Sequence, residues 1–182
     1  LSYLNDVGWG GILADDMGLG KTIQTISYFA YLKQEHDITG KHLIICPLTV
    51  CNNWQRELKK WMPISMFKSS GVLKKQDNST GTFVKSRNFD VLITPYHSAV
   101  SCVNILKKIP WEVFIIDEAH KIKNDEAILT ESVKQFNAAF KMLLTGTPLS
   151  NNLRELWSLL NFIMPDIFHD RDLFDQIEEG IN

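Results

Sequence analysis

The sequence predicts an α/β domain built on a mainly parallel sheet with helices on both faces. Five short apolar runs are rich in Ile, Val and Leu, and each is continuous rather than alternating, as is typical of strands buried on both faces. Segments with a helical spacing of apolar residues lie between these runs, as right-handed crossovers require. A chain of 182 residues can bury one hydrophobic core without disulfides or metals, and we expect a single domain over residues 1–182.

Each predicted strand is a short apolar run bounded by polar or turn residues. The five strands are expected over residues 11–14, 42–46, 91–94, 113–116 and 142–145. Residues 69–86 carry no such pattern and are rich in Ser, Thr, Gly and Lys. We therefore expect a surface excursion or an irregular hairpin there.

Helical spacing of apolar residues follows the first two strands. It covers residues 23–30 after the first strand, and it recurs at i, i+4 and i+7 from Trp54 after the second. We expect the second of these helices to begin behind a cap at Asn52 or Asn53. Further helices are expected over residues 98–109, 126–136 and 153–164, the last of them ended by Pro165.

Charge is unevenly distributed along the chain, although the formal net charge is only −2. Residues 54–87 hold eight basic and two acidic side chains, whereas residues 151–182 hold two basic and seven acidic ones. A near-neutral total therefore does not exclude a polyanionic partner. The basic segment is either a solvated lysine-rich face or a contact surface for a phosphate backbone.

The three cysteines, Cys46, Cys51 and Cys102, lack the C-x2-C spacing of a zinc site, and we expect reduced thiols in an intracellular protein. The longest apolar stretch, residues 43–51, is interrupted by Pro47 and is far shorter than the ~20 residues of a membrane span. The first residues include neither a starting Met nor a targeting core, so we expect the chain to begin inside a longer protein.

Residues 11–22 have the order strand, glycine-bearing loop, Lys-Thr and helix, which is the layout of a phosphate-binding loop. Backbone N–H groups of the loop and the positive end of the following helix favour an anion, and glycines let the backbone approach it. Lys21 would reach the β- and γ-phosphates, and the Thr22 hydroxyl can bind Mg²⁺. The strict pattern has Gly where this chain has Asp15, and the alternative is a plain glycine-rich turn before a helix.

Two acids, Asp117 and Glu118, directly follow a buried apolar run. An ionised carboxylate at the end of such a strand needs a compensating partner, and beside a phosphate loop that partner is a metal ion. Asp117 would hold Mg²⁺ through water, and Glu118 would orient or deprotonate the attacking water. Ligands of open α/β sheets bind outside the carboxyl ends of the strands, where both segments put their polar residues. His120 is an alternative metal ligand, although no second His or Cys stands near it in the sequence.

Three motifs together resemble those of the Swi/Snf-type ATPases, helicase-superfamily motors that translocate on double-stranded DNA and remodel chromatin. They are residues 15–22, residues 117–120 (DEAH) and residues 144–149 (LTGTPL). Residues 46–54, 93–96 and 155–162 resemble further motifs of this family, and all six stand in the family's order. Residues 46–50 and 165–168 are most similar to the imitation-switch, chromodomain-helicase and lymphoid-specific-helicase branch.

The resemblance implies a RecA-like phosphate-loop NTPase lobe, the first of the two lobes of such a motor. The adenine-reading Gln motif, the second lobe and the arginine finger would lie outside this chain. ATP and Mg²⁺ are the implied cofactors, and ATP hydrolysis is the implied activity. The implied partners are double-stranded DNA, nucleosomes and the second RecA-like lobe of the same parent chain, in the nucleus.

The resemblance also assigns roles to single positions, with Lys21 and Glu118 as catalytic residues and Thr22 and Asp117 as Mg²⁺ ligands. The ATP phosphates would be wrapped by Asp15, Asp16, Met17, Gly18, Leu19, Gly20, Lys21 and Thr22. The nucleotide state would be coupled to DNA by His120, Thr145, Gly146 and Thr147. The DNA-facing edge would carry Thr49, Asn53, Trp54, Thr94 and Tyr96, to which the basic segment adds Lys74 and Lys75.

Some of these assignments stay open. Trp54 has the alternative role of an apolar anchor of its helix, and the choice is similar for Thr94 and Tyr96. Asp16 stands where the family usually has Glu, which keeps the charge. Ser150 stands where the family commonly has Gln, which leaves the coupling between the lobes in question.

Two other functions compete with a DNA-translocating ATPase. The first is a nucleotide-gated binding module without productive turnover, against which the intact Lys21, Thr22, Asp117 and Glu118 argue. The second is an RNA helicase lobe with the same DEAH box. The Asp-Asp-Met loop and the GTP-containing third motif favour the double-stranded-DNA branch instead.

Reversing the charge of Lys74 and Lys75 tests the two interpretations of the basic segment. If these lysines contact the DNA backbone in the parent protein, their change to Glu flattens the salt dependence of DNA binding, because fewer counterions are released. DNA affinity measured over a range of salt concentrations checks this. An unchanged slope would indicate a merely solvated loop.

Overall fold

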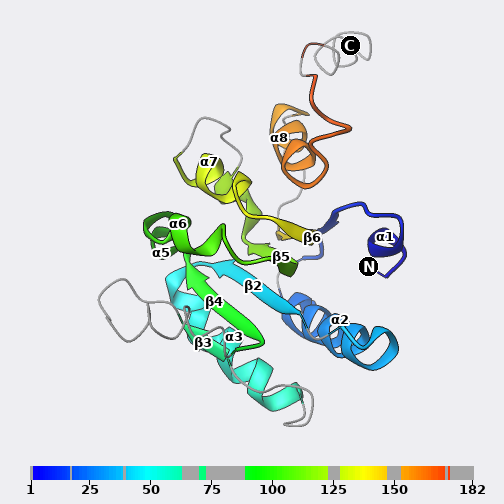
Figure 1. The fold of residues 1–182 in the computed structure, drawn as a ribbon, viewed down its shortest axis with the longest axis vertical. Helices are drawn as coiled ribbons and strands as arrows, with labels where there is room; N and C mark the ends of the chain where they lie inside the picture. Colours follow the sequence, from blue (N-terminus) through cyan, green and yellow to red (C-terminus); the bar gives the residue numbers. More distant parts are fainter. Residues whose placement is uncertain are drawn as a thin grey trace.

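The computed structural model describes residues 2–16, 18–38, 40–62, 70–72, 89–122, 128–146, 153–170 and 172. Six strands form one sheet in the order β1-β6-β5-β2-β4-β3, and each of the five pairings is parallel (Figure 1). The strands are β1 (Gly11–Leu13), β2 (Lys41–Cys46), β3 (Ser70–Val72), β4 (Val91–Pro95), β5 (Trp111–Asp117) and β6 (Ala138–Leu144). The predicted fold class is confirmed, and all five predicted strands are present.

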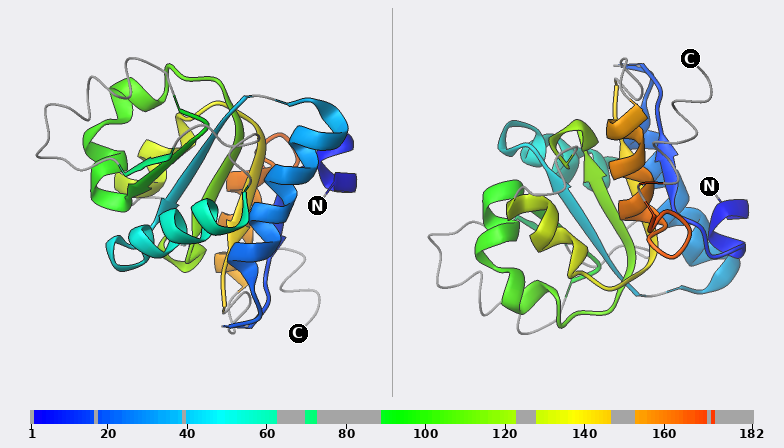
Figure 2. Two further views of the ribbon diagram at one scale, coloured as in Figure 1. Left: turned by 90° about the horizontal axis from the view of Figure 1, so that it is seen from below. Right: turned by 90° about the horizontal axis from the view of Figure 1, so that it is seen from above.

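Helices cover both faces of the sheet (Figures 1 and 2). One face carries α2 (Lys21–His36) and α3 (Leu48–Trp61), and α1 (Ser2–Asp6) lies near the N-terminus. The other face carries α5 (Tyr96–Ser101), α6 (Val103–Leu106), the 3₁₀-helix η1 (Ala119–Ile122), α7 (Ile128–Lys134) and α8 (Leu153–Ile163). None of the described helices is both long and apolar enough to cross a membrane.

Alternate residues of the central strands pack into two separate hydrophobic cores, one on each face of the sheet. This explains why the sequences of these strands are continuously apolar. On β5, Val113 and Ile115 pack with the side chains of α2 and α3. Phe114 and Ile116 point to the opposite face, where the Phe114 ring meets Phe136 and Phe162 edge to face at centroid distances of 5.5 and 5.8 Å. Strand β5 is therefore covered on both faces along most of its length.

Two local predictions are wrong. Helix α3 begins at Leu48 and not behind an asparagine cap, because Pro47, with φ −56°, already has a helix-compatible φ and directly precedes it. The helix expected over residues 98–109 is two short helices that meet at Cys102, whose φ of −108° departs from helical geometry. Ser, Cys, Val and Asn around this break are weak helix formers.

The segment expected as an excursion or hairpin contains a strand. Residues Ser70–Val72 form β3, which pairs in parallel with β4 at the edge of the sheet and so isn't part of a hairpin. A three-residue strand with Ser and Gly has little β-propensity of its own, and its tertiary contacts, above all the pairing with β4, define it. Residues 73–88 lie outside the described residues.

The cysteines and His42 show how polar atoms are accommodated in this core. Cys46, Cys51 and Cys102 are thiols that form no disulfide, as predicted, with the Sγ atoms of Cys46 and Cys51 3.4 Å apart. The ring of His42 on β2 stacks on Phe29 of α2 at a centroid distance of 4.4 Å. Burial lowers the pKa of His42 to about 4, although Asp90 acts in the opposite direction.

We predict that His42 makes the stability of the fold depend on pH. Between the ordinary His pKa of about 6.5 and the folded-state value of about 4, the unfolded chain binds the proton and the folded chain doesn't. The free energy of unfolding therefore falls as the pH falls through this window, by up to roughly 3 kcal/mol at its acid end. Urea unfolding at a series of pH values measures this.

The variant His42→Leu removes that component, whereas His97→Gln, at an exposed histidine, retains it. Equal pH dependence of unfolding in wild type and His42→Leu would contradict the prediction.

Candidate active site

The candidate site lies at the carboxyl ends of β1 and β5, which flank β6 in the sheet. The chain leaves β1 at Leu13 and enters α2 at Lys21, and β5 ends at Asp117. The backbone N–H of Thr145, just after β6, donates to the Leu13 carbonyl over 3.2 Å and ties these strand ends together. The structure thus brings the two predicted polar segments to one edge of the sheet.

The loop before α2 depends on two glycines. Gly18 has φ +88° and Gly20 has φ +83°, in the left-handed region where an L side chain is strained. Gly20 is the N-cap of α2 and offers no side-chain cap. The first N–H groups of a 16-residue helix, at the positive end of its dipole, are therefore not capped by a side chain and suit an anion.

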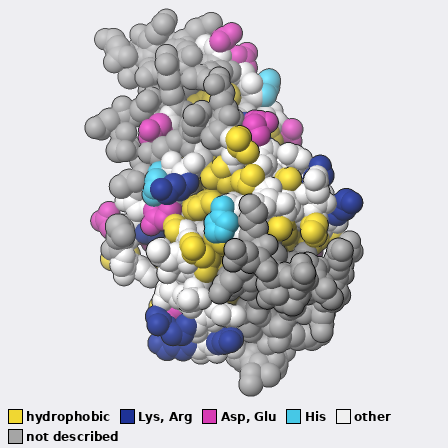
Figure 3. Space-filling view, turned by 90° about the vertical axis from the view of Figure 1, so that its left-hand side faces the viewer, with side chains coloured by type: hydrophobic (Ala, Val, Ile, Leu, Met, Phe, Trp, Pro, Cys, Tyr) yellow, Lys and Arg dark blue, Asp and Glu magenta, His cyan; other side chains and the backbone are white. Residues whose placement is uncertain are grey.

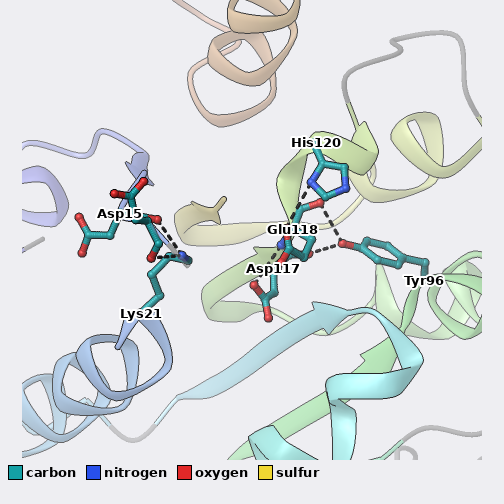
Figure 4. A network of polar contacts seen from close by, with 7 residues as sticks. Asp15, Lys21, Tyr96, Asp117, Glu118 and His120 are labelled. Carbon is teal, nitrogen blue, oxygen red and sulfur yellow. Dashed lines mark hydrogen bonds and ion pairs between the residues drawn. The ribbon is translucent and has the colours of Figure 1, made fainter. Parts of the chain in front are cut away.

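Lys21 folds back over this loop. Its Nζ donates to the carbonyl oxygens of Asp15 and Asp16 at 2.7 and 3.1 Å (Figure 4). These bonds hold the ammonium beside the N-terminus of α2. Carbonyl oxygens compensate a full positive charge only in part, so phosphate oxygens would be stronger partners for it.

Sequence reasoning did not identify Gln24. Its Nε2 donates to Oδ2 of Asp15 over 2.8 Å and approaches the Leu19 carbonyl at 3.3 Å. Gln24 stands one turn after Lys21, on the same side of α2. This i, i+3 spacing is the sequence signal that could have placed Gln24 beside the loop. The contact explains why an aspartate fits where the strict phosphate-loop pattern has glycine: the Asp15 side chain ties the start of the loop to the helix.

Both carboxylate oxygens of Asp117 have protein donors. Oδ2 accepts from the indole Nε1 of Trp54 over 2.8 Å, and Oδ1 accepts from the backbone N–H of Glu118 over 3.0 Å. Burial raises the pKa of Asp117, the hydrogen bond from Trp54 opposes that shift, and the charge of Lys21 acts in the same direction as Trp54. A carboxylate removed from water in this way favours a nearby cation.

Glu118 adopts a strained backbone. Its φ of +58° is in the left-handed region, which costs roughly 1–3 kcal/mol for a residue other than glycine and is typical of functional sites. The Tyr96 hydroxyl donates to the carbonyl of Asp117 and lies 3.3 Å from that of Glu118 (Figure 4). His120 Nδ1 lies 3.3 Å from Glu118 Oε2, without the geometry of a hydrogen bond.

The described residues contain no group of three or more His, Cys, Asp or Glu side chains that could hold a metal ion by themselves. Mg²⁺ needs no such group, because it keeps several waters and takes one or two protein ligands together with phosphate oxygens. The partly buried Thr22 hydroxyl and Asp117 carboxylate are oxygen donors of this kind. The residues present therefore fit a magnesium–nucleotide complex.

The predicted DNA-facing residues fall into two groups. Trp54 of α3 and Thr94 within β4 are buried, which favours the alternative of an apolar anchor for Trp54. Thr49 is exposed and Asn53 is partly exposed. The predicted residues Met17, Lys74, Lys75 and Thr147 lie outside the described residues.

Comparison with known proteins decides the family. Residues 2–179 match the SNF2-related domain. The chain belongs to this family. The SNF2-related chain is 46% identical over its whole length to the ISWI chromatin-remodeling complex ATPase ISW2 of Saccharomyces cerevisiae, of which it covers 16%.

Two further comparisons agree with this family. The chain is 43% identical, over 96% of its length, to the human SWI/SNF-related matrix-associated actin-dependent regulator of chromatin subfamily A member 1, of which it covers 17%. Its fold matches the Sulfolobus solfataricus SWI2/SNF2 ATPase core in complex with dsDNA with a TM-score of 0.84 at 34% identity, over 98% of this chain and 37% of that one. The SNF2-related chain thus spans about a sixth of the length of the curated relatives it matches.

Proposed function

We propose that this chain is the ATP-binding and hydrolysing lobe of a DNA-dependent ATPase that translocates on double-stranded DNA and remodels nucleosomes. The observation that carries the proposal is the placement of Lys21, at the N-terminus of α2, and of the acids Asp117 and Glu118 at the same edge of the sheet. Burial raises the pKa of Asp117, and the positive charge of Lys21 opposes that rise. The names of the relatives, chromatin-remodeling ATPases, support the assignment.

Each residue has a definite part in this proposal. The N–H groups of the loop and Lys21 bind the ATP phosphates, while the Thr22 hydroxyl and Asp117 hold Mg²⁺. A bound Mg²⁺ would supply positive charge to the phosphate oxygens. Glu118 orients the attacking water and accepts its proton. Its contact with His120 supports a role for His120, with Thr145, Gly146 and Thr147, in coupling the nucleotide state to DNA.

Helix α3 supplies a surface that suits a DNA backbone. Thr49, Asn53, Arg56 and Lys60 follow one another at i, i+4, i+7 and i+11, so they share one side of the helix, opposite the buried Cys51 and Leu58. The Asn53 side-chain oxygen accepts from Arg56 over 2.6 Å. Such uncharged and basic groups contact phosphates without reading sequence.

The described basic side chains are spread over the visible face of the lobe (Figure 3). On the face that Figure 3 shows, Lys and Arg lie in several separate clusters with apolar side chains between them. We propose that the second RecA-like lobe of the same parent chain completes both the DNA contact and the ATP site, in the nucleus.

The lysine of the loop provides the direct test. In the full-length protein, double-stranded DNA should stimulate ATP hydrolysis strongly, and Lys21→Ala should abolish hydrolysis because the phosphates lose their cation. The lobe alone should bind Mg-ATP weakly and hydrolyse it very slowly, because an arginine finger contributes about 10³- to 10⁵-fold in rate, or roughly 4–7 kcal/mol of barrier.

Lys33→Ala is the matched control, because this lysine lies on the same helix and pairs with Asp37 at 3.7 Å. Full activity of Lys21→Ala would refute the assignment. Stimulation by single-stranded RNA instead of duplex DNA would indicate an RNA helicase.

A further inference from the structure

Two aromatic side chains from separate segments donate hydrogen bonds to the turn formed by Asp117 and Glu118. Trp54 comes from α3, which follows β2, and Tyr96 is the first residue of α5, which follows β4. In the sheet, β2 is the neighbour of β5 and β4 is the next strand beyond it. The helices that follow β2 and β4 therefore begin at the same edge of the sheet at which β5 ends. Both residues were expected near the DNA-facing edge, and in the structure each donates a hydrogen bond to Asp117.

The two contacts restrain different parts of the turn. Trp54 holds the Asp117 carboxylate at Oδ2 while the Glu118 N–H holds Oδ1, which fixes the orientation of the side chain. Tyr96 holds the backbone, since its hydroxyl donates to the Asp117 carbonyl beside that of Glu118 (Figure 4). The Glu118 carbonyl also accepts from the Lys121 N–H over 3.0 Å.

The turn needs such restraint. Asp37 and Glu118 are the described non-glycine residues with positive φ, and Asp37 is an exposed residue that ends α2. A left-handed residue at the reacting centre persists only where its surroundings determine it. The Trp54 indole is 1% exposed, so water cannot readily replace it as the donor to Asp117.

We infer that Trp54 and Tyr96 are positioning residues of the ATPase reaction: Trp54 orients Asp117 toward the metal ion, and Tyr96 holds Glu118 toward the attacking water. The inference rests on the proposed function. Neither side chain touches the nucleotide in this assignment, and each acts through an acid of the turn. Removing either hydrogen bond should therefore affect metal use or turnover while phosphate binding by the loop persists.

The test uses Tyr96→Phe and Trp54→Phe in the full-length protein, with two readouts. The first is kcat and KM for ATP in the presence of DNA. The second is the dissociation constant of a fluorescent, non-hydrolysable ATP analogue, measured with and without Mg²⁺. Thermal unfolding of each variant establishes that it is folded.

We expect Tyr96→Phe to lower kcat about tenfold or more with the analogue affinity within about twofold, because a displaced catalytic group loses rate without loss of binding. We expect Trp54→Phe to reduce the Mg²⁺-dependent gain in analogue affinity by about tenfold, the size typical of lost supporting contacts at a metal site, with the Mg²⁺-free affinity nearly unchanged.

The chain offers matched controls. Trp61→Phe removes a 2.8 Å indole bond to Glu57 on the same helix, and Tyr31→Phe removes a hydroxyl that contacts His36 at 3.0 Å. Both residues are exposed, and both controls should behave as wild type. If Trp54→Phe fails to fold, the kcat of Tyr96→Phe still tests the inference.

A wild-type kcat for Tyr96→Phe, or a folded Trp54→Phe with an undiminished Mg²⁺ effect, would overturn the inference. Failure of the proposed function looks different: the wild type would not bind Mg-ATP, or Lys21→Ala would remain active.

Discussion

The structure around the site depends on one constraint, the placement of a carboxylate at the end of a strand that is buried on both faces. Strand β5 is sandwiched between two hydrophobic cores and paired on both edges, so Asp117 cannot withdraw from the sheet without moving β2 and β6. Burial disfavours its charge and raises its pKa. Everything nearby that donates a hydrogen bond or carries positive charge offsets that cost.

The groups that offset the cost of burying the Asp117 charge come from three parts of the chain. Lys21 acts on Asp117 through its charge, Trp54 through its indole N–H, and Glu118 through its backbone N–H, which is directed by a strained φ. The same donors that make the charge tolerable also fix its geometry. A divalent cation between Asp117 and the phosphates would complete this compensation, and nucleotide binding would then stabilise the site.

Much of this arrangement could be predicted from the sequence. Continuous apolar runs revealed the parallel strands, and the positions of Lys21, Asp117 and Glu118 after strands placed them at one edge. Local patterns could not show the contacts between segments. The Trp54 indole and Asp117 are 63 residues apart in sequence, and no periodicity relates them. Trp54 at helical spacing indicates a buried helix face, but not that its N–H meets a carboxylate.

Errors in the elements have similar causes. The edge strand β3 exists through its pairing with β4, so its own residues gave no signal. Helix α3 starts at Leu48 because of the backbone geometry at Pro47, whereas the predicted asparagine caps lie inside it. In both places tertiary or backbone constraints prevailed over side-chain preference. Gln24 was overlooked because its partner, Asp15, departs from the expected glycine.

The most direct measurement is a crystal structure of the protein with Mg²⁺ and a non-hydrolysable ATP analogue. We predict that Lys21 Nζ leaves the carbonyl oxygens of Asp15 and Asp16 for the phosphates, with Mg²⁺ between Thr22 and Asp117 and the bond from Trp54 to Asp117 retained. Phosphates bound away from the N-terminus of α2, or Lys21 still bonded to the loop carbonyls beside a bound nucleotide, would contradict the assignment of this site.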